Sequence, residues 1–232
     1  MSGLLFICVM EHIFRSLTRR WKKLDARRTG TYYGIVIDDP TDPLTNLRFA
    51  DDVLLVASCR ADAAKMIADL NDEAQKFGLK LHLGKTCILT NSSRPLPEKI
   101  PCRSLNVRVL QHGEAEKYLG RRLTAKDQHE TELQNRMSCG WKASFKFKGA
   151  LTNRRVPLKH RYVLFESVVT PSVLYACSAW ALTAEPENSL RKCRRRMLRW
   201  MVGVTRRPDE EWPAYMHTAN ALAESPAETR LR

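Results

Sequence analysis

The chain has 232 residues, enough for one sizeable domain or two small ones, and its hydrophobic content of 44% is sufficient for a buried core. Its 39 Lys and Arg against 25 Asp and Glu give a formal net charge of +14, which favours a nucleic-acid partner over a membrane surface, although a basic protein without a polyanionic partner is the alternative. The seven cysteines form no C-x-x-C pair and no zinc-ligand pattern with the histidines, no apolar run reaches the length of a membrane span, and the N-terminus lacks signal-peptide features. These features predict an intracellular protein, nuclear or cytoplasmic.

The first part of the chain combines an apolar helix with a basic stretch. Apolar residues recur at helical spacing from Ser2 to Leu17, which predicts a buried helix. Seven Lys and Arg follow between Arg15 and Arg28, either as phosphate contacts or as a solvated linker. Residues Tyr32 to Ile37 are typical of a strand, and the Asp- and Pro-rich residues 38–43 of a turn.

Two adjacent acids then stand between two short apolar runs. The sequence from Leu47 to Ala57 predicts a tight β-hairpin with Asp51 and Asp52 at its turn. An Asp-Asp pair is most often an ordinary turn, because Asp bonds nearby backbone. If the two acids meet a third carboxylate, they can instead hold Mg²⁺, which prefers oxygen ligands.

The next segment supplies packing for the hairpin. A helix is expected from Ser58 to Phe77, capped by Gly78. Its apolar face should pack on the sheet that carries the acids, with its own acids and Lys65 on the other face. The apolar face comprises Ala63, Ile67, Leu70, Ala74 and Phe77. Strands are expected at 79–83, which alternates, and at 87–90.

The remainder changes from strands to helices near Lys126. Residues 91–101 are expected to form a loop, and 107–110 and 118–120 strands of a small sheet. Three helices should follow: the first from Asp127 to about Lys148, the second from Pro157, and the third from Pro186 to Gly203. The first should pack through Leu133, Met137, Trp141 and Phe145. Pro171 should kink or interrupt the second, and the tail after Trp212 should fray.

Positive charge concentrates in this helical region. Residues 127–207 hold 16 Lys and Arg against 6 Asp and Glu. The third helix carries six of the basic residues, which are candidates for contact with a nucleic-acid backbone, with a solvated helix face as the alternative. They are Arg191, Lys192, Arg194, Arg195, Arg196 and Arg199. The tryptophans 141, 180, 200 and 212 are more typical of core packing than of base stacking.

Several motifs resemble reverse transcriptases in the order that this family shows. Phe49-Ala50-Asp51-Asp52 followed by Val-Leu-Leu-Val is similar to the metal-binding hairpin of non-LTR (LINE-type) retrotransposon enzymes. Residues 78–86 resemble the next palm motif, and residues 116–120 resemble the primer-grip segment. Residues 174–175, 180–183 and 195–200 resemble the downstream region of many such elements. The resemblance covers nearly the whole chain.

The resemblance implies roles for particular residues. Asp51 and Asp52 are expected to bind Mg²⁺ or Mn²⁺ in two-metal nucleotidyl transfer. Lys85 is expected to protonate the departing pyrophosphate, with a solvent lysine or phosphate contact as the alternative. Tyr118, Leu119 and Gly120 are expected to help place the primer 3′ end, and Tyr118 as ordinary core is the alternative. The partners would be an RNA template and a DNA primer, with no membrane.

The chain also departs from this family. The family's further metal-binding Asp and its fingers lie before the segment that resembles the first helix, and this chain has no counterpart of them. We therefore expect an α+β fold with a partial palm at 1–125, a helical thumb-like region at 126–208 and a tail at 209–232. Alone, such a fragment should be inactive, because metal affinity falls with ligand count. The alternatives are a non-catalytic basic nucleic-acid-binding module and a degenerate retroelement remnant.

Overall fold

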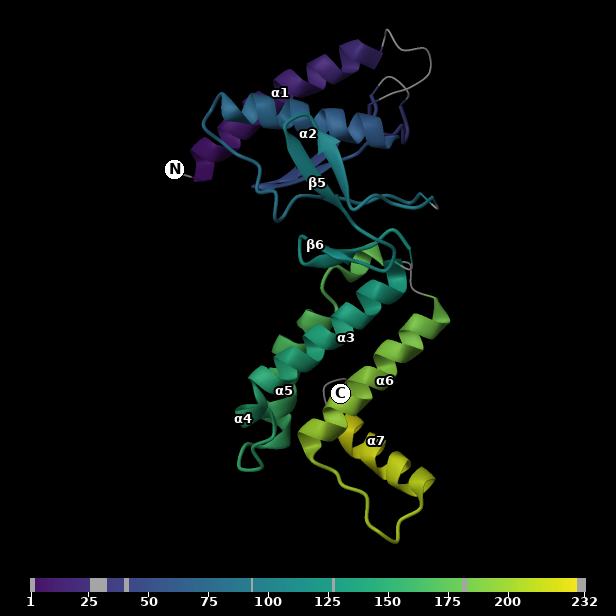
Figure 1. The fold of residues 1–232 in the computed structure, drawn as a ribbon. Helices are drawn as coiled ribbons and strands as arrows, with labels where there is room; N and C mark the ends of the chain where they lie inside the picture. The colour runs from purple at the N-terminus through teal and green to yellow at the C-terminus, as the bar shows by residue number, and fades with distance from the viewer. Residues whose placement is uncertain are drawn as a thin grey trace. The chain divides into compact units, whose positions relative to one another are not determined.

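The computed structural model describes residues 3–25, 33–39, 42–92, 94–126, 128–180 and 183–228, without the side chains of 22–25 and 222–228. The chain divides into two compact units (Figure 1). Unit 1 comprises Met1–Gly120 with Thr124–Lys126, and unit 2 comprises Arg121–Leu123 with Asp127–Arg232. Helices and small sheets occur together, in agreement with the expected α+β class.

Two helices and two small sheets form in the described part of unit 1. The helices are α1 (Gly3–Asp25) and α2 (Arg60–Gln75), and the strands are β1 (Asn46–Phe49), β2 (Asp52–Leu55), β3 (Cys87–Ile88), β4 (Lys99–Cys102), β5 (Leu105–Val109) and β6 (Glu116–Tyr118). Strands β1 and β2 form an antiparallel hairpin. The second sheet has the order β3-β5-β4, with β3 parallel and β4 antiparallel to the central β5.

Helix α2 is buried between two apolar cores of unit 1. One core joins α2 to α1 through Met66, Leu70 and the fully buried Trp21. The other joins Ile67 of α2 to the β3-β5-β4 sheet. Val53 and Leu55 of the hairpin pack against the first core. The helix therefore packs on the hairpin that carries the acids, as the sequence predicted. The predicted faces are wrong in part, because Phe77 is 41% exposed and the acids Asp62 and Asp69, expected on the outer face, are buried.

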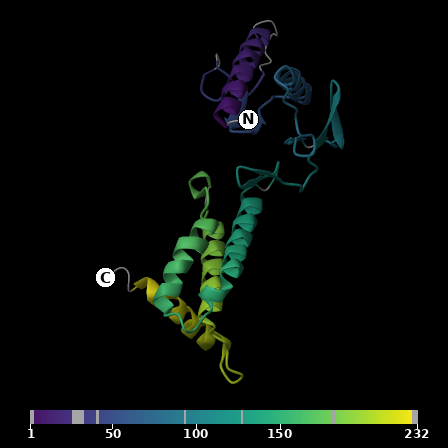
Figure 2. The same cartoon turned by 90° about the vertical axis from the view of Figure 1, so that its left-hand side faces the viewer.

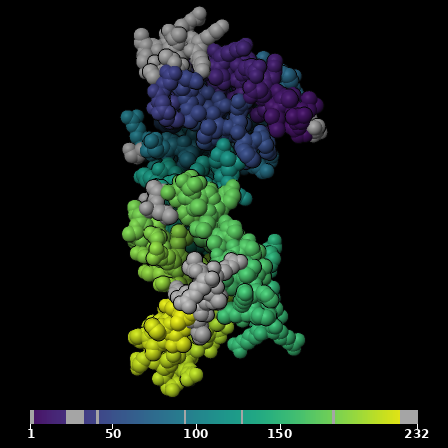
Figure 3. Space-filling view, turned by 180° about the vertical axis from the view of Figure 1, so that it is seen from behind, coloured from purple at the N-terminus to yellow at the C-terminus, as the bar shows by residue number. Residues whose placement is uncertain are grey.

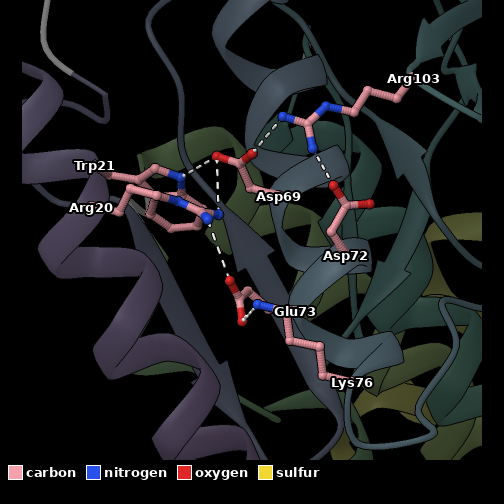
Figure 4. A network of polar contacts seen from close by, with 7 residues as sticks. All are labelled: Arg20, Trp21, Asp69, Asp72, Glu73, Lys76 and Arg103. Atoms are coloured by element: carbon pink, nitrogen blue, oxygen red, sulfur yellow. Dashed lines mark hydrogen bonds and ion pairs between the residues drawn. The ribbon is translucent and has the colours of Figure 1, made fainter.

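A buried carboxylate of α2 organises the polar contacts beside the first core (Figure 4). Asp69 accepts a hydrogen bond of 3.1 Å from the indole Nε1 of Trp21. Its two oxygens also lie 3.4 Å from the guanidinium of Arg20 and 3.2 Å from that of Arg103. Asp72 and Glu73 extend the network to the same arginines. Elements separated by many residues are thus held at one point of α2.

Several expectations for unit 1 need correction. The first helix continues to Asp25, so Arg15, Arg19 and Arg20 belong to it rather than to a linker. Residues 79–83 form no strand, although Leu79 and Leu81 still pack inward, because no neighbouring strand offers hydrogen bonds to this segment. The predicted strand at 32–37 is reduced to one bridge between Ile35 and Leu44, and Tyr32 lies outside the described residues.

Other boundaries differ by a few residues. The loop predicted to reach Pro101 ends at Lys99, where β4 begins, because β4 is an edge strand and tolerates a proline that donates no hydrogen bond. Of the strand predicted at 87–90, only Cys87–Ile88 forms. The glycine cap of α2 is confirmed: Gly78 has φ +71, and the amide of Leu79 donates to the carbonyl of Ala74.

The described residues of unit 2 are helical apart from one short strand. Its elements are β7 (Arg121–Leu123), α3 (Gln128–Lys146), α4 (Lys148–Leu151), α5 (Leu158–Val173), a 3₁₀ turn η1 (Cys177–Ala179), α6 (Ala184–Val202) and α7 (Trp212–Glu228). Helices α3, α5 and α6 run alongside one another (Figure 2). Phe165 and Val169 of α5 and Met197, Leu198 and Met201 of α6 are at the centre of the core.

The buried face of α3 is shifted from the predicted one. Leu133 is buried as expected, but Phe145 is 56% exposed, and Gly140 and Ser144 face the core instead. A Cβ added at Gly140 would lie 2.5 Å from Cγ2 of Val173 and 2.9 Å from Cε of Met197. Glycine and serine in α3 therefore allow a close approach of α5 and α6, which a pattern of large apolar residues does not reveal.

The other helices of unit 2 differ from the prediction in their ends. Pro171 lies in the last turn of α5 without interrupting it, and the helix continues to Val173. Gly203 ends α6 with φ +75, as expected. The expected fraying after Trp212 is wrong, because α7 begins there and runs to Glu228. The predicted cap at Asp127 falls outside the described residues.

One segment meets the criteria of length and apolarity for a membrane span, contrary to the expectation from sequence. Residues Leu158–Ala179 reach a mean hydropathy of 1.2 over 18 residues. Core helices of globular proteins pass the same test, and α5, which makes up most of this segment, contributes Tyr162, Phe165 and Val169 to the core.

Replacing Asp69 by Asn should loosen unit 1. The neutral amide loses the charge-assisted bonds from Trp21, Arg20 and Arg103, so we expect a loss of about 2 kcal/mol in the stability of α2. Hydrogen–deuterium exchange of the α2 amides measures this loss of stability. Asp72→Asn is the matched control, because Asp72 pairs with Arg103 while its side chain is 46% exposed. Equal effects of the two variants would contradict a special role of the buried carboxylate.

Replacing Gly140 by Ala should destabilise unit 2. Alanine normally favours a helix interior by roughly 1 kcal/mol. Here the new Cβ meets Val173 and Met197, and we expect a net loss of about 1–3 kcal/mol, measured as faster amide exchange in α3. Gly149→Ala is the control, since nothing lies within 4 Å of its added Cβ. A stabilised Gly140→Ala variant would show that α3 does not depend on this close approach.

Candidate metal site and basic helix

The acidic pair lies at the tip of the β1–β2 hairpin, as predicted. The register pairs Phe49 with Asp52 and Arg48 with Val53, which leaves Ala50 and Asp51 as a two-residue turn. Asp51 is therefore a turn residue, and Asp52 is the first residue of β2. Both acids are exposed.

The turn contains an unusual backbone conformation. Ala50 has φ +54, in the left-handed region that residues with a Cβ rarely adopt. Two-residue hairpin turns require a positive φ at their first central position, which explains why the tight connection imposes it on Ala50. This tight turn places both acids at the tip of the hairpin.

The hairpin has a buried and an exposed face. Residues directly opposite in an antiparallel pair share a face. Val53 and Leu55 pack on the core, whereas Phe49, opposite Asp52, is 66% exposed, and Leu47 is 47% exposed. Asp52 thus belongs to an outer face that is apolar apart from the acid.

Helix α1 holds the inner face of the hairpin. The guanidinium of Arg48 donates to a carboxylate oxygen of Glu11 at 2.8 Å and lies 4.9 Å from the ring centroid of Phe14. The bond from Arg48 and its charge, with a smaller contribution from Arg15, lower the pKa of Glu11. The space-filling view shows α1, in purple, against the blue hairpin segment (Figure 3).

Neither acid at the tip is neutralised by a neighbour. Among the described residues, no hydrogen bond or ion pair involves the carboxylate of Asp51 or Asp52. The same part of the chain contains no group of three or more His, Cys, Asp or Glu placed to hold a metal ion. The site therefore offers two free carboxylates, which suit a hard cation, but not a complete ligand set.

Tyr118 at the end of β6 is electrostatically coupled to the hairpin. Burial raises the pKa of the Tyr118 phenol, and the negative charge of Asp52 raises it further. The structure therefore brings together one residue of the expected metal site and one of the expected primer grip, a relation that no sequence pattern indicated.

Leu119 and Gly120 do not continue the strand, which corrects the expectation for 118–120. Their φ values are +47 and +78, the combination of a type I′ turn. Leucine is strained there, and such strain collects at functional sites. Strands β6 and β5 also do not share a sheet, contrary to the sequence prediction.

Lys85 lies in an exposed turn of residues 83–85. Its backbone amide donates to the carbonyl of His82 at 2.9 Å. Within the described part of the chain its ammonium has no bond or ion pair.

Five of the six basic residues predicted to bind nucleic acid divide into two groups on α6. Three have partners in the protein: Arg191 pairs with Glu187, Arg194 bonds Glu166 and Tyr162, and Arg199 bonds Asn220. Lys192 and Arg196 are exposed and, in the parts of the chain that are described, form no ion pair. Helical spacing of about 100° per residue places Lys192, Arg195, Arg196 and Arg199 on one face.

Sequence reasoning did not identify the tether of the hairpin. Arg48 and Glu11 are 37 residues apart, and neither stands in a motif or a periodic pattern that pairs them. The phenol of Tyr118 was also not linked to Asp52. Only the packing of α1 and β6 in unit 1 reveals these relations.

Replacing Asp52 by Asn should lower the pKa of Tyr118. The carboxylate disfavours the phenolate, so loss of its charge moves that pKa down toward the ordinary tyrosine value, while the effect of burial remains. ¹³C NMR titration of the tyrosine ring carbon bonded to oxygen follows this group. Asp51→Asn is the control and should leave the titration unchanged. An unchanged Tyr118 titration in Asp52→Asn would show that the charge of Asp52 does not influence the pKa of Tyr118.

Comparison with known proteins gives the family of this chain. Residues 1–149 match the reverse transcriptase (RNA-dependent DNA polymerase) family. A transposon-derived protein of Caenorhabditis elegans is 32% identical over 163 residues, which are 70% of this chain and 58% of that protein. The aligned segment thus spans little more than half of the relative. No solved structure matches the chain. The match covers more than half of the residues, including the acidic hairpin, and the chain belongs to the reverse transcriptase family.

Proposed function

We propose that the chain is the palm and thumb part of a LINE-type retrotransposon reverse transcriptase. The observation that carries this proposal is the acidic hairpin inside the matched region. Asp51 and Asp52 are held at an exposed tip by strand register and are free of protein partners among the described residues. Two adjacent carboxylates without a protein partner leave their oxygen atoms available as ligands for a hard cation.

Mg²⁺ or Mn²⁺ is the cation that these residues fit. Both take carboxylate oxygens, and when bound they would stabilise the attacking and leaving oxygens of nucleotidyl transfer. The chain's own contribution is to fix the hairpin: Val53 and Leu55 anchor it in the core, and Arg48 ties it to Glu11.

A further carboxylate is required, and we propose that polypeptide outside these 232 residues supplies it. The exposed apolar outer face of the hairpin, with Leu47 and Phe49, is consistent with a covering segment. Without it the two acids bind metal weakly, and the chain alone does not incorporate nucleotides.

The remaining predicted residues act on the nucleic acid in this proposal. Tyr118, Leu119 and Gly120 help to place the primer end near Asp52, in keeping with the electrostatic coupling of Tyr118. Lys85 either protonates pyrophosphate or contacts phosphate. The exposed basic face of α6 binds the backbone of an RNA template–DNA primer duplex. The logarithm of the binding constant should therefore fall linearly with the logarithm of the salt concentration.

A second candidate is a nucleic-acid-binding module without catalysis. It is favoured by the charge distribution, since the helical residues 127–207 hold 16 of the 39 Lys and Arg but only 6 of the 25 Asp and Glu. This activity needs neither metal nor a third carboxylate. It predicts the same salt dependence but no role for Asp51 and Asp52.

The test combines metal binding with polymerisation. Mn²⁺ should broaden the backbone NMR signals of residues 50–52 in the wild type, and the double variant Asp51→Asn, Asp52→Asn should abolish this broadening. Asp38→Asn with Asp39→Asn is the matched control, because it removes another adjacent acid pair. If the control variant lost the Mn²⁺ broadening of residues 50–52 to the same extent, the broadening would reflect general negative charge. That result would contradict a metal site at Asp51 and Asp52.

Nucleotide incorporation on an RNA template–DNA primer with Mg²⁺ completes the test. The chain alone should bind the duplex in a salt-dependent manner without extending the primer. Extension that the double variant loses would show a complete site within these residues and overturn the proposed need for a further carboxylate. Failure to bind the duplex at low salt would overturn the function as a whole.

A further inference from the structure

Helices α3 and α6 carry a cluster of three aromatic rings outside the candidate sites. Trp141 and Phe145 of α3 stack with centroids 5.7 Å apart and planes inclined by 29°. Trp200 of α6 meets both rings edge to face, with centroids 6.2 Å from Trp141 and 5.4 Å from Phe145. We call these three residues the aromatic platform.

The platform is rigid at its base and open at Phe145. Trp141 and Trp200 are half-buried and pack against the core of unit 2. Phe145 is 56% exposed. The shift of the packing face of α3 toward Gly140 and Ser144 leaves this ring in water. A large ring held in solvent by two others offers a preformed surface for stacking.

Cations flank the platform and lack acidic partners. The guanidinium of Arg196 lies 5.9 Å from the ring centroid of Trp141. Lys142 and Lys146 are sequence neighbours of the two α3 rings, and both are exposed. None of the three forms an ion pair with a described residue. Trp200 follows Arg196 by four residues, so it lies one turn along α6, beside the face that carries Lys192 and Arg199.

Rings together with uncompensated cations match one ligand chemistry. A nucleic-acid strand presents flat bases and anionic phosphates at regular spacing, and unpaired bases stack on aromatic side chains while Lys and Arg follow the backbone. A base-paired duplex has no free base faces along its length and would leave the platform unused. An acidic peptide would satisfy the cations without stacking on the rings.

We propose that the aromatic platform binds an unpaired stretch of a nucleic-acid strand, with a base stacked on Phe145 and its phosphates near Arg196 and Lys146. This inference rests on the proposed function in one respect, since it takes nucleic acid as the partner. It adds a site for single strands that is independent of the acidic hairpin and of the metal.

Fluorescence anisotropy with labelled single strands tests the site in the full-length chain. The probes are a 20-residue oligothymidylate, the corresponding oligouridylate and a strand of the same length made of abasic nucleotides. Phe145→Ala should weaken binding of the two base-bearing strands about tenfold, the size of one lost base–aromatic stack. It should leave the abasic strand unaffected, because that strand interacts through phosphates alone. Phe145→Trp should bind the base-bearing strands like the wild type, and Phe145→Leu should weaken their binding as Phe145→Ala does.

Trp212→Ala is the matched control. Trp212 is 58% exposed, belongs to unit 2, and has Arg206 6.0 Å from its ring centroid. It should bind all strands like the wild type. Arg196→Gln should weaken the base-bearing and abasic strands alike and reduce the salt dependence of both. Circular dichroism of each variant verifies that unit 2 is folded.

The outcomes separate this inference from the proposed function. The stacking site would be overturned if Phe145→Ala and Phe145→Leu bound oligothymidylate and oligouridylate with wild-type affinity. It would also be overturned if these variants lost as much affinity for the abasic strand as for the base-bearing strands. Salt-dependent binding of the primer–template duplex would remain in either case if the proposed function is right. Binding of a polyglutamate peptide that Phe145→Ala weakens as much as oligothymidylate would assign the platform to acidic chains instead and overturn the proposal.

Discussion

The burial of α2 on two sides is the constraint on which unit 1 depends. One face of the helix packs on α1 and the hairpin, and another packs on the β3-β5-β4 sheet. A helix in this position has little room for charge, yet Asp69 is buried in it and only 4% exposed. The carboxylate is tolerated because Trp21, Arg20 and Arg103 satisfy it. The same contacts fix α1, which in turn holds Arg48 of the hairpin through Glu11. The geometry of the acidic tip thus depends on a polar contact in the interior.

The sequence predicted those elements whose signal is local. The hairpin, α2 with its Gly78 cap and the end of α6 at Gly203 follow from periodicity and from glycine or turn residues. The segment 79–83 has the alternation of a strand, but a strand also needs a hydrogen-bonded neighbour, and alternation does not supply one. The α3 face was misplaced because small residues, Gly140 and Ser144, make the contact there.

The sequence indicated the individual residues of the candidate site, but not the contacts and the electrostatic coupling between them. The motif resemblance identified Asp51, Asp52 and Tyr118 individually. Their coupling and the tether from Arg48 to Glu11 depend on contacts between segments that are far apart in sequence. On α6, the sequence grouped six basic residues as candidates for contact with nucleic acid, whereas Arg194 bonds Tyr162 and Glu166 within the protein. Helix periodicity separates these roles only once the buried face is known.

The distribution of charge explains how one basic chain can present both an anionic tip and a cationic surface. With a net charge of +14, the chain as a whole repels cations at long range. Beyond about 10 Å salt screens this repulsion, so the local field at the hairpin tip is governed by Asp51 and Asp52. Arg48, the cation nearest to them in sequence, is engaged by Glu11 on the inner face and does not neutralise the tip. Among the described residues, the two acids are therefore left available to a cation, and Lys192 and Arg196 of α6, which form no ion pair, are left available to an anion.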